Sequence, residues 1–91
     1  PLWLSFELSR SGLHQLAKQV EAGQPPAGPV RAGAYRVVKH EMRDGHATLW
    51  ITDGGNPDCF VLGMADHDIR MNFNLWSYYR INSDWHIVHE D

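Results

Sequence analysis

The stretch VVKHEMRDGHATLWI, residues 37–51, carries the clearest structural signal in the chain. Its central dipeptide, Asp44–Gly45, is typical of a two-residue turn between antiparallel strands, because both residues tolerate the positive φ angles that such a turn requires. Pairing outward from this turn places a mostly apolar set of side chains on one face of the hairpin. The paired residues on that face are Met42 and Ala47, His40 and Leu49, and Val38 and Ile51. The turn and the apolar pattern therefore predict the same register.

The other face of the predicted hairpin is polar except for one tryptophan. It pairs Arg43 with His46, Glu41 with Thr48, and Lys39 with Trp50. Because successive residues of a strand point to opposite faces, Glu41 cannot reach the face that carries His40.

A third strand is predicted by the segment CFVLGMA, residues 59–65, which follows a loop rich in glycine and aspartate. Its apolar residues alternate, so Phe60, Leu62 and Met64 are expected to share one face. Cys59 then points to the opposite face, where the sequence offers no cation to activate a thiol. We interpret Cys59 as an unreactive small residue rather than a nucleophile.

The C-terminal third predicts one long strand and a closing hairpin. The motif DHD at residues 66–68 is expected to form a polar turn, and apolar residues alternate from Ile69 to Leu75. A second turn at residues 82–84 leads into a last strand that begins at Trp85. In this register Tyr79 and Ile81 share a face with Trp85 and Ile87.

The N-terminal residues predict a strand followed by an amphipathic helix. Apolar residues alternate with polar ones in the strand and recur at i, i+3, i+4 and i+7 in the helix. The apolar residues of the strand are Leu2, Leu4, Phe6 and Leu8, and those of the helix are Leu13, Leu16, Ala17 and Val20. Ser9 or Ser11 is the expected helix cap, and Gly23 is the expected stop before the extended segment GQPPAGP.

Together these elements predict a single α+β domain spanning residues 1–91, in the order β-α-β-β-β-β-β. One amphipathic helix on one face of a curved antiparallel sheet buries every apolar stripe described above. This layout resembles cystatin-like folds, including the cone-shaped family of nuclear transport factor 2. The resemblance concerns the arrangement of elements and implies no function.

A second resemblance covers the N-terminal third of the chain. The segment PLWLSFELSRSGLHQLAKQVEAGQPPAGPVRAGAY, residues 1–35, is similar to small bacterial proteins of uncharacterised function. It contains no catalytic motif, and the resemblance implies a bacterial origin without an activity.

Composition narrows the choice of partners. The chain has a formal net charge of −3 and its 8 lysines and arginines form no cluster, which argues against nucleic acid or an anionic membrane as the main partner. The single cysteine excludes an internal disulfide, and no apolar run approaches the roughly 20 residues that span a bilayer. Because the first residue is Pro1, we expect a longer gene product, so the compartment stays open between the cytoplasm and a location outside it.

Two histidine motifs are candidate metal or catalytic sites. In WHIVHED, residues 85–91, His86 and His89 would converge on a helix but face opposite sides of a strand, and the strand is the better prediction. The acids around His67 could bind a divalent ion or orient this histidine as a base, but a polar turn is favoured. We therefore predict no metal, no cofactor and no catalytic residue.

His40 is the one polar residue on the apolar face of the predicted hairpin. A buried imidazole needs a hydrogen-bond partner. One interpretation is a core histidine that a backbone group or water satisfies. The other is a polar anchor or general acid/base in a pocket between helix and sheet.

The opposite face of the predicted sheet is aromatic and has no helix to cover it. Its expected members are Trp50, Trp76, Tyr78, His86 and Val88, with Arg70, Asn72, Asn74 and Arg80 beside them. Exposed Trp, Tyr and Arg residues dominate binding hot spots, so this face is a candidate interface for a second copy, a peptide or a sugar. Alternatively, Trp50 and Trp76 lie flat on neighbouring strands and only protect the sheet.

The preferred functional hypothesis is a non-enzymatic interaction module that self-associates as a homodimer, or binds a protein or peptide, through this aromatic face. The alternative is a small-molecule pocket protein or enzyme in which His40 is the polar anchor or general acid/base.

Overall fold

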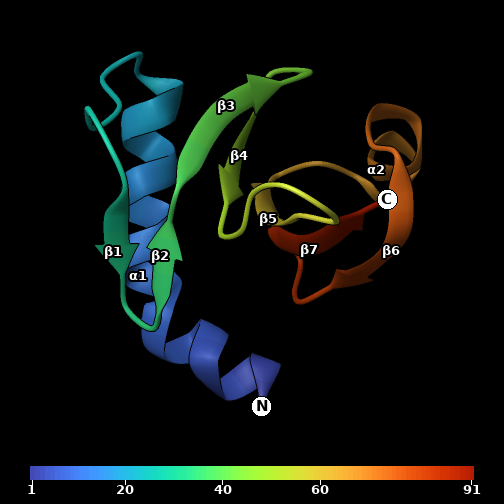
Figure 1. The fold of residues 1–91 in the computed structure, drawn as a ribbon, viewed down its shortest axis with the longest axis horizontal. Coiled ribbons are helices and arrows are strands. Elements are labelled where there is room, and N and C mark those ends of the chain that lie inside the picture. Colours follow the sequence, from blue (N-terminus) through green and yellow to red (C-terminus); the bar gives the residue numbers. More distant parts are fainter.

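A five-stranded antiparallel sheet lies between two helices, with α1 on one face and α2 on the other (Figure 1). The computed structural model describes residues 1–91. Its elements are α1 (Leu2–Glu21), β1 (Val30–Ala32), β2 (Tyr35–Val37), β3 (Lys39–Arg43), β4 (His46–Trp50), β5 (Asp58–Leu62), α2 (Asp66–Asn72), β6 (Leu75–Arg80) and β7 (Trp85–Glu90). The sheet has the strand order β3-β4-β5-β7-β6, and β1 pairs with β2 in a separate hairpin. The predicted α+β class with an antiparallel sheet is confirmed.

The N-terminal strand predicted at residues 2–8 is wrong, because α1 is one continuous helix from Leu2 to Glu21. Phe6 and Leu13 are fully buried in this helix, whereas Leu8 is 72% exposed. A strand would have buried Leu8 together with Phe6, because residues two apart share a face. The short alternating run fitted the strand pattern only because both buried and exposed positions of the first helical turns are apolar.

The serines expected to cap the helix lie inside it. The Ser9 hydroxyl donates a hydrogen bond to the carbonyl oxygen of Ser5 at 2.7 Å and accepts one from the backbone N–H of Ala34 at 2.8 Å. Ala34 belongs to the turn between β1 and β2, so Ser9 fixes this hairpin on α1. The cap predicted at Ser9 or Ser11 is therefore wrong, and Ser9 makes a tertiary contact instead.

The turn and register of the central hairpin are confirmed over residues 39–50. The predicted outermost pair, Val38 with Ile51, is wrong, because Val38 packs against the second core and Ile51 against the first. Asp44 and Gly45 both have positive φ angles, 51° and 79°, as the predicted turn requires. The observed partners are Met42 and Ala47, His40 and Leu49, Arg43 and His46, Glu41 and Thr48, and Lys39 and Trp50. Local turn chemistry and the apolar pattern agreed at this site, and the fold follows both.

The turn at residues 66–68 and the strand predicted from Ile69 are wrong, because Asp66–Asn72 forms the helix α2. Ile69 and Phe73 are both buried at a spacing of four residues, while Met71, between them, is 71% exposed. This burial pattern is helical. The acidic residues in the first turn also favour a helix, since they complement its dipole.

Two apolar cores result, one on each face of the sheet. The first packs α1 and the β1–β2 hairpin against Leu49, Phe60 and Trp85, and the second packs α2 against Trp50 and Val88. The C-terminal hairpin has the predicted register, with Tyr79 opposite Ile87. Met64 lies in the second core, contrary to its predicted face with Phe60, because β5 ends at Leu62. Neither helix is both long and apolar enough to cross a membrane.

Candidate functional site

The sheet face that the sequence predicted to be uncovered is covered by α2. Trp50 and His86 are each only 2% exposed, and Val88 is fully buried beneath the same helix. The sequence predicted Trp50 and His86 as part of an exposed interface, but both side chains are buried and have little surface to offer a partner. The physical reason is the helix at residues 66–72, which supplies the second layer that the predicted strand could not supply.

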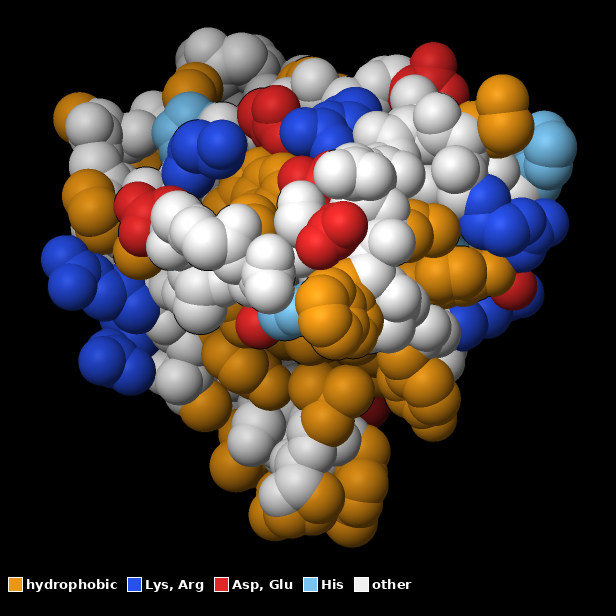
Figure 2. Space-filling view, turned by 45° about the vertical axis from the view of Figure 1, so that its right-hand side comes forward, with side chains coloured by type: hydrophobic (Ala, Val, Ile, Leu, Met, Phe, Trp, Pro, Cys, Tyr) orange, Lys and Arg blue, Asp and Glu red, His pale blue; other side chains and the backbone are white.

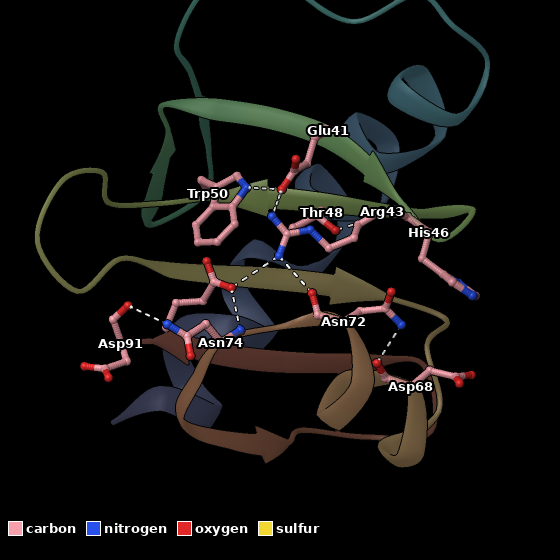
Figure 3. Close-up of polar contacts among 10 residues, drawn as sticks. Glu41, Arg43, His46, Thr48, Trp50, Asp68, Asn72, Asn74 and Asp91 are labelled. Carbon is pink, nitrogen blue, oxygen red and sulfur yellow. Dashed lines mark hydrogen bonds and ion pairs between the residues drawn. The ribbon is translucent and has the colours of Figure 1, made fainter.

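The Trp50 ring is held by polar contacts as well as by apolar packing. Its Nε1–H donates a hydrogen bond to Glu41 Oε1 at 2.8 Å. The Lys39 ammonium and the Arg43 guanidinium lie over the ring, 5.0 and 5.6 Å from its centroid. Figure 3 shows Trp50 and Arg43 converging on the same Glu41 carboxylate. These contacts assign Trp50 a structural role.

Arg43 joins three elements that are distant in the sequence (Figure 3). Its guanidinium donates to Glu41 Oε1 at 2.8 Å, to Glu90 Oε2 at 3.2 Å and to the carbonyl oxygen of Asn72 at 3.2 Å. Asn72 ends α2 and Glu90 ends β7, so this residue locks the helix and the last strand onto the β3–β4 hairpin. Arg43 therefore connects β3, α2 and β7 around the second core.

We expect Arg43→Met to destabilise the protein by about 2 kcal/mol, because two partly buried carboxylates and a helix carbonyl lose a charged donor. Urea unfolding followed by tryptophan fluorescence measures this loss. Arg10→Met is the matched control, since the Arg10–Glu7 pair is exposed and 3.6 Å long; its expected effect is below about 0.5 kcal/mol. Equal losses of unfolding free energy in the two variants would contradict this role of Arg43.

A second polar contact anchors the start of α2. His86 Nε2 lies 2.5 Å from Asp66 Oδ1, and this hydrogen bond holds the pKa of the Asp66 carboxyl below its usual value. The other ring nitrogen, Nδ1, is buried without a hydrogen-bond partner. Tyr78 packs beside the imidazole, and its hydroxyl accepts a hydrogen bond from Arg70 at 2.8 Å. His86 and Tyr78 thus fasten α2 to the sheet.

The other predicted site residues occupy separate places. His40 is half-buried, and its Nε2 lies 3.3 Å from the carbonyl oxygen of Pro26, which can accept a hydrogen bond from it. None of the four cavities of the structure is lined by His40. Arg80 is exposed at the end of β6 and donates to the carbonyl oxygen of Asn82. Burial raises the pKa of the Cys59 thiol, so this group stays protonated.

Trp76 alone among the predicted aromatic residues is largely exposed, at 66%. The pairing of β6 with β7 is irregular between Leu75 and Ser77, as in a β-bulge, which re-aims side chains locally. The Trp76 ring lies edge-on to His89 with the ring centroids 6.0 Å apart. His89 in turn donates a hydrogen bond from Nδ1 to Asp58 Oδ1. As predicted, His89 and His86 have unrelated partners on opposite sides of the sheet.

An apolar groove lies between the first turn of α1 and the end of β6. It has a volume of about 240 Å³ and is lined by Leu2, Trp3, Tyr79 and Ile81. Trp3 and Tyr79 are 65% and 61% exposed. We call Trp3, Tyr79 and Trp76, with Leu2 and Ile81, the aromatic edge surface. Figure 2 shows hydrophobic side chains gathered at the lower end of the molecule, where Figure 1 places the first turns of α1.

The sequence pointed to Trp76 but not to Trp3 or Tyr79. The sequence pattern predicts a strand at Trp3, and a strand gives no indication that this side chain lies on an exposed flank of a helix. Tyr79 was correctly paired with the apolar face, but α1 does not extend far enough over β6 to cover it. Only the observed helix position shows that these two aromatic side chains meet.

The largest cavity, about 590 Å³, runs along α1 beside the turn between β6 and β7. It is lined mainly by polar side chains, including Arg10, His14, Lys18 and Asp84. Arg10 and Lys18 are already paired with Glu7 and Glu21 on the same helix. No group of three or more His, Cys, Asp or Glu side chains converges in a way that could hold a metal ion.

Comparison with known proteins adds no relative: no family model, no curated protein and no solved structure matches the chain.

Proposed function

We propose that the chain is a self-associating interaction module, in which two copies cover each other's aromatic edge surface. The observation that carries this proposal is that the first two turns of α1 expose three large apolar side chains on faces turned away from the core. Phe6 faces the core, while Trp3, Leu4 and Leu8 are exposed on the other sides. Large apolar side chains exposed close together are typical of an interface, so these turns offer a surface that the fold itself does not cover.

The neighbouring strand supports the same proposal. β6 is an edge strand, with β7 on one side and no strand on the other. An open edge can pair with a further strand, and two copies of β6 can do so about a two-fold axis. Such pairing would place Tyr79 and Trp76 of each copy near the same residues of the other. Trp and Tyr at the centre of an interface supply most of its binding energy.

A second copy is the partner that fits the surface chemistry best. The groove is lined by four apolar residues and no charged one, so it selects an apolar side chain. Trp3 is a large exposed side chain at the groove itself, and a second copy of the chain carries the same side chain at the same place. A two-fold interface is self-complementary, so each groove can receive an apolar side chain from the other copy.

Sedimentation velocity over a concentration series tests this proposal. We expect a monomer–dimer equilibrium, and we expect Trp3→Ala to raise the dimer Kd by about 30-fold, the equivalent of about 2 kcal/mol for a hot-spot tryptophan. Met71→Ala is the matched control, because Met71 is equally exposed but lies on α2, outside the aromatic edge surface. A chain that is monomeric at every concentration, or a Kd that changes equally in both variants, would overturn the proposal.

The alternative predicted from sequence, a ligand pocket around His40, has weaker support. His40 has a backbone acceptor in Pro26 and lines no cavity. The aromatic edge surface is therefore the better basis for a function.

A further inference from the structure

We infer that Asp58, His89 and Ser77 form a relay that makes the Ser77 hydroxyl reactive toward small activated esters. The three residues come from β5, β7 and β6, which lie side by side at one end of the sheet. They also line one cavity of about 280 Å³ on the face opposite α2. This inference concerns the single chain, since the proposed self-association would cover Tyr79 and Trp76 beside the same cavity.

Strand pairing places the three residues in one row. His89 lies directly opposite Asp58 on one side and directly opposite Ser77 on the other. Residues directly opposite each other on antiparallel strands point to the same face, with their Cβ atoms about 4.5–5.5 Å apart. His89 is hydrogen-bonded to Asp58 and not to Ser77 in the structure, and rotation about the Cα–Cβ bond of Ser77 would bring its hydroxyl toward the imidazole.

The Asp58–His89 hydrogen bond orients the imidazole as a proton relay requires. His89 Nδ1 is hydrogen-bonded to Asp58 Oδ1, and a carboxylate at this position favours the tautomer that carries its proton on Nδ1. The second nitrogen, Nε2, is then the proton acceptor, as in Ser–His–Asp catalytic groups. Asp58 and His89 are each about one-third exposed, so the pair is oriented by the protein and still open to a substrate.

The cavity suits a small acyl group. Ile87 and Tyr79 give it an apolar wall beside Ser77 and His89. The irregular pairing at the start of β6 brings Trp76 to the rim, next to His89. β-bulges are common beside active sites because they re-aim side chains in this way.

The reaction proceeds in two balanced steps. Ser77 Oγ bonds to the acyl carbon of the ester, its proton passes to His89 Nε2, and the leaving alcohol or phenol takes that proton as its bond to carbon breaks. A water molecule then attacks the acyl-serine, again giving its proton to Nε2. The proton returns to Ser77 Oγ as the acid leaves, so the serine is regenerated.

Covalent labelling with diisopropyl fluorophosphate tests the inference at a single atom. The reagent forms a phosphoester with an activated serine and releases fluoride, and peptide mapping by mass spectrometry locates the label. Ser83 is an internal control, because it is exposed like Ser77 but lies in the β6–β7 turn without a histidine partner. We expect Ser77 to react about 100-fold faster than Ser83, the lower range of general-base catalysis.

Variants separate the roles of the three residues. We expect His89→Gln to reduce the Ser77 labelling rate to that of Ser83, Asp58→Asn to reduce it by about 10-fold or more, and Ser83→Ala to leave it unchanged. The hydrolysis of para-nitrophenyl acetate should follow the same order, with Ser77→Ala abolishing the enzymatic rate. Labelling a dilute, monomeric sample keeps this result separate from any effect of self-association.

Equal labelling of Ser77 and Ser83 in the folded wild-type chain would overturn the inference without any variant. Full labelling in a folded His89→Gln chain would overturn it as well. Circular dichroism establishes that each variant is folded before its rate is compared.

Discussion

Gly33→Ala is expected to destabilise the protein by about 2–5 kcal/mol, from the combined costs of a left-handed backbone and an overpacked contact. Gly33 has a φ angle of +61°, a conformation that L side chains rarely adopt. A Cβ atom there would lie 2.5 Å from Ser9 Cα and 2.5 Å from Ser9 Oγ. Because one of these atoms belongs to the helix backbone, the β1–β2 turn itself must move away from α1.

The same displacement removes the hydrogen bond from the Ala34 N–H to the Ser9 hydroxyl. Urea unfolding measures the combined loss. Gly28→Ala is the matched control, because nothing lies within 4 Å of a Cβ atom there and its φ angle is not in the left-handed range. A Gly33→Ala chain as stable as the Gly28→Ala chain would show that the turn does not pack on α1 as described.

Phe6→Ala is expected to cost about 3–5 kcal/mol, the usual loss for a buried phenylalanine. Its ring is fully buried and lies 5.5 Å from the Phe60 ring and 5.8 Å from the Trp85 ring, measured between centroids. It is therefore the main apolar contact between the first turns of α1 and the sheet. A domain of this size has a total stability of about 5–15 kcal/mol, so the variant should be partly unfolded at modest urea concentrations.

Leu8→Ala is the informative companion to Phe6→Ala. In a strand over residues 2–8 the two side chains would share a buried face and both losses would be large. In the observed helix Leu8 is 72% exposed, so its removal should change stability by less than about 0.5 kcal/mol. Comparable destabilisation in both variants would be evidence for the strand and against α1 as one helix.

The same two positions show why the N-terminal structure could not be predicted from its pattern. Leu4, Phe6 and Leu8 alternate as in a strand, but the exposed members of the set belong to the aromatic edge surface or its surroundings. Under the proposed self-association, Leu4 and Leu8 would face a second copy, so they are hydrophobic positions that burial within one chain does not explain. A periodicity analysis then assigns the wrong period, because it assumes that apolar residues face the core of their own chain.

The segment Asp66–Phe73 was ambiguous for a different reason. Its apolar residues, Ile69, Met71 and Phe73, alternate in sequence, yet only the first and last are buried. Seven residues form too short a helix to be stable alone, so packing on the sheet selects this conformation. Once the helix is present, the sheet face with Trp50 and Val88, which was predicted as an interface, packs against α2 in the second core.

The sequence by itself determined the parts of this protein whose signals are local. The Asp44–Gly45 turn and the alternating strands around it establish the central hairpin and its register, and the turn before Trp85 does the same for the last hairpin. These signals are local because neighbouring residues alone decide which backbone angles and faces are available.

Only the tertiary structure decided which face of the sheet is covered and which distant side chains meet. The row of Asp58, His89 and Ser77 depends on the strand order β5-β7-β6, and the groove of Trp3 and Tyr79 depends on where α1 crosses the sheet. Neither arrangement leaves a pattern in the sequence, because packing between elements, rather than spacing along the chain, brings these residues together.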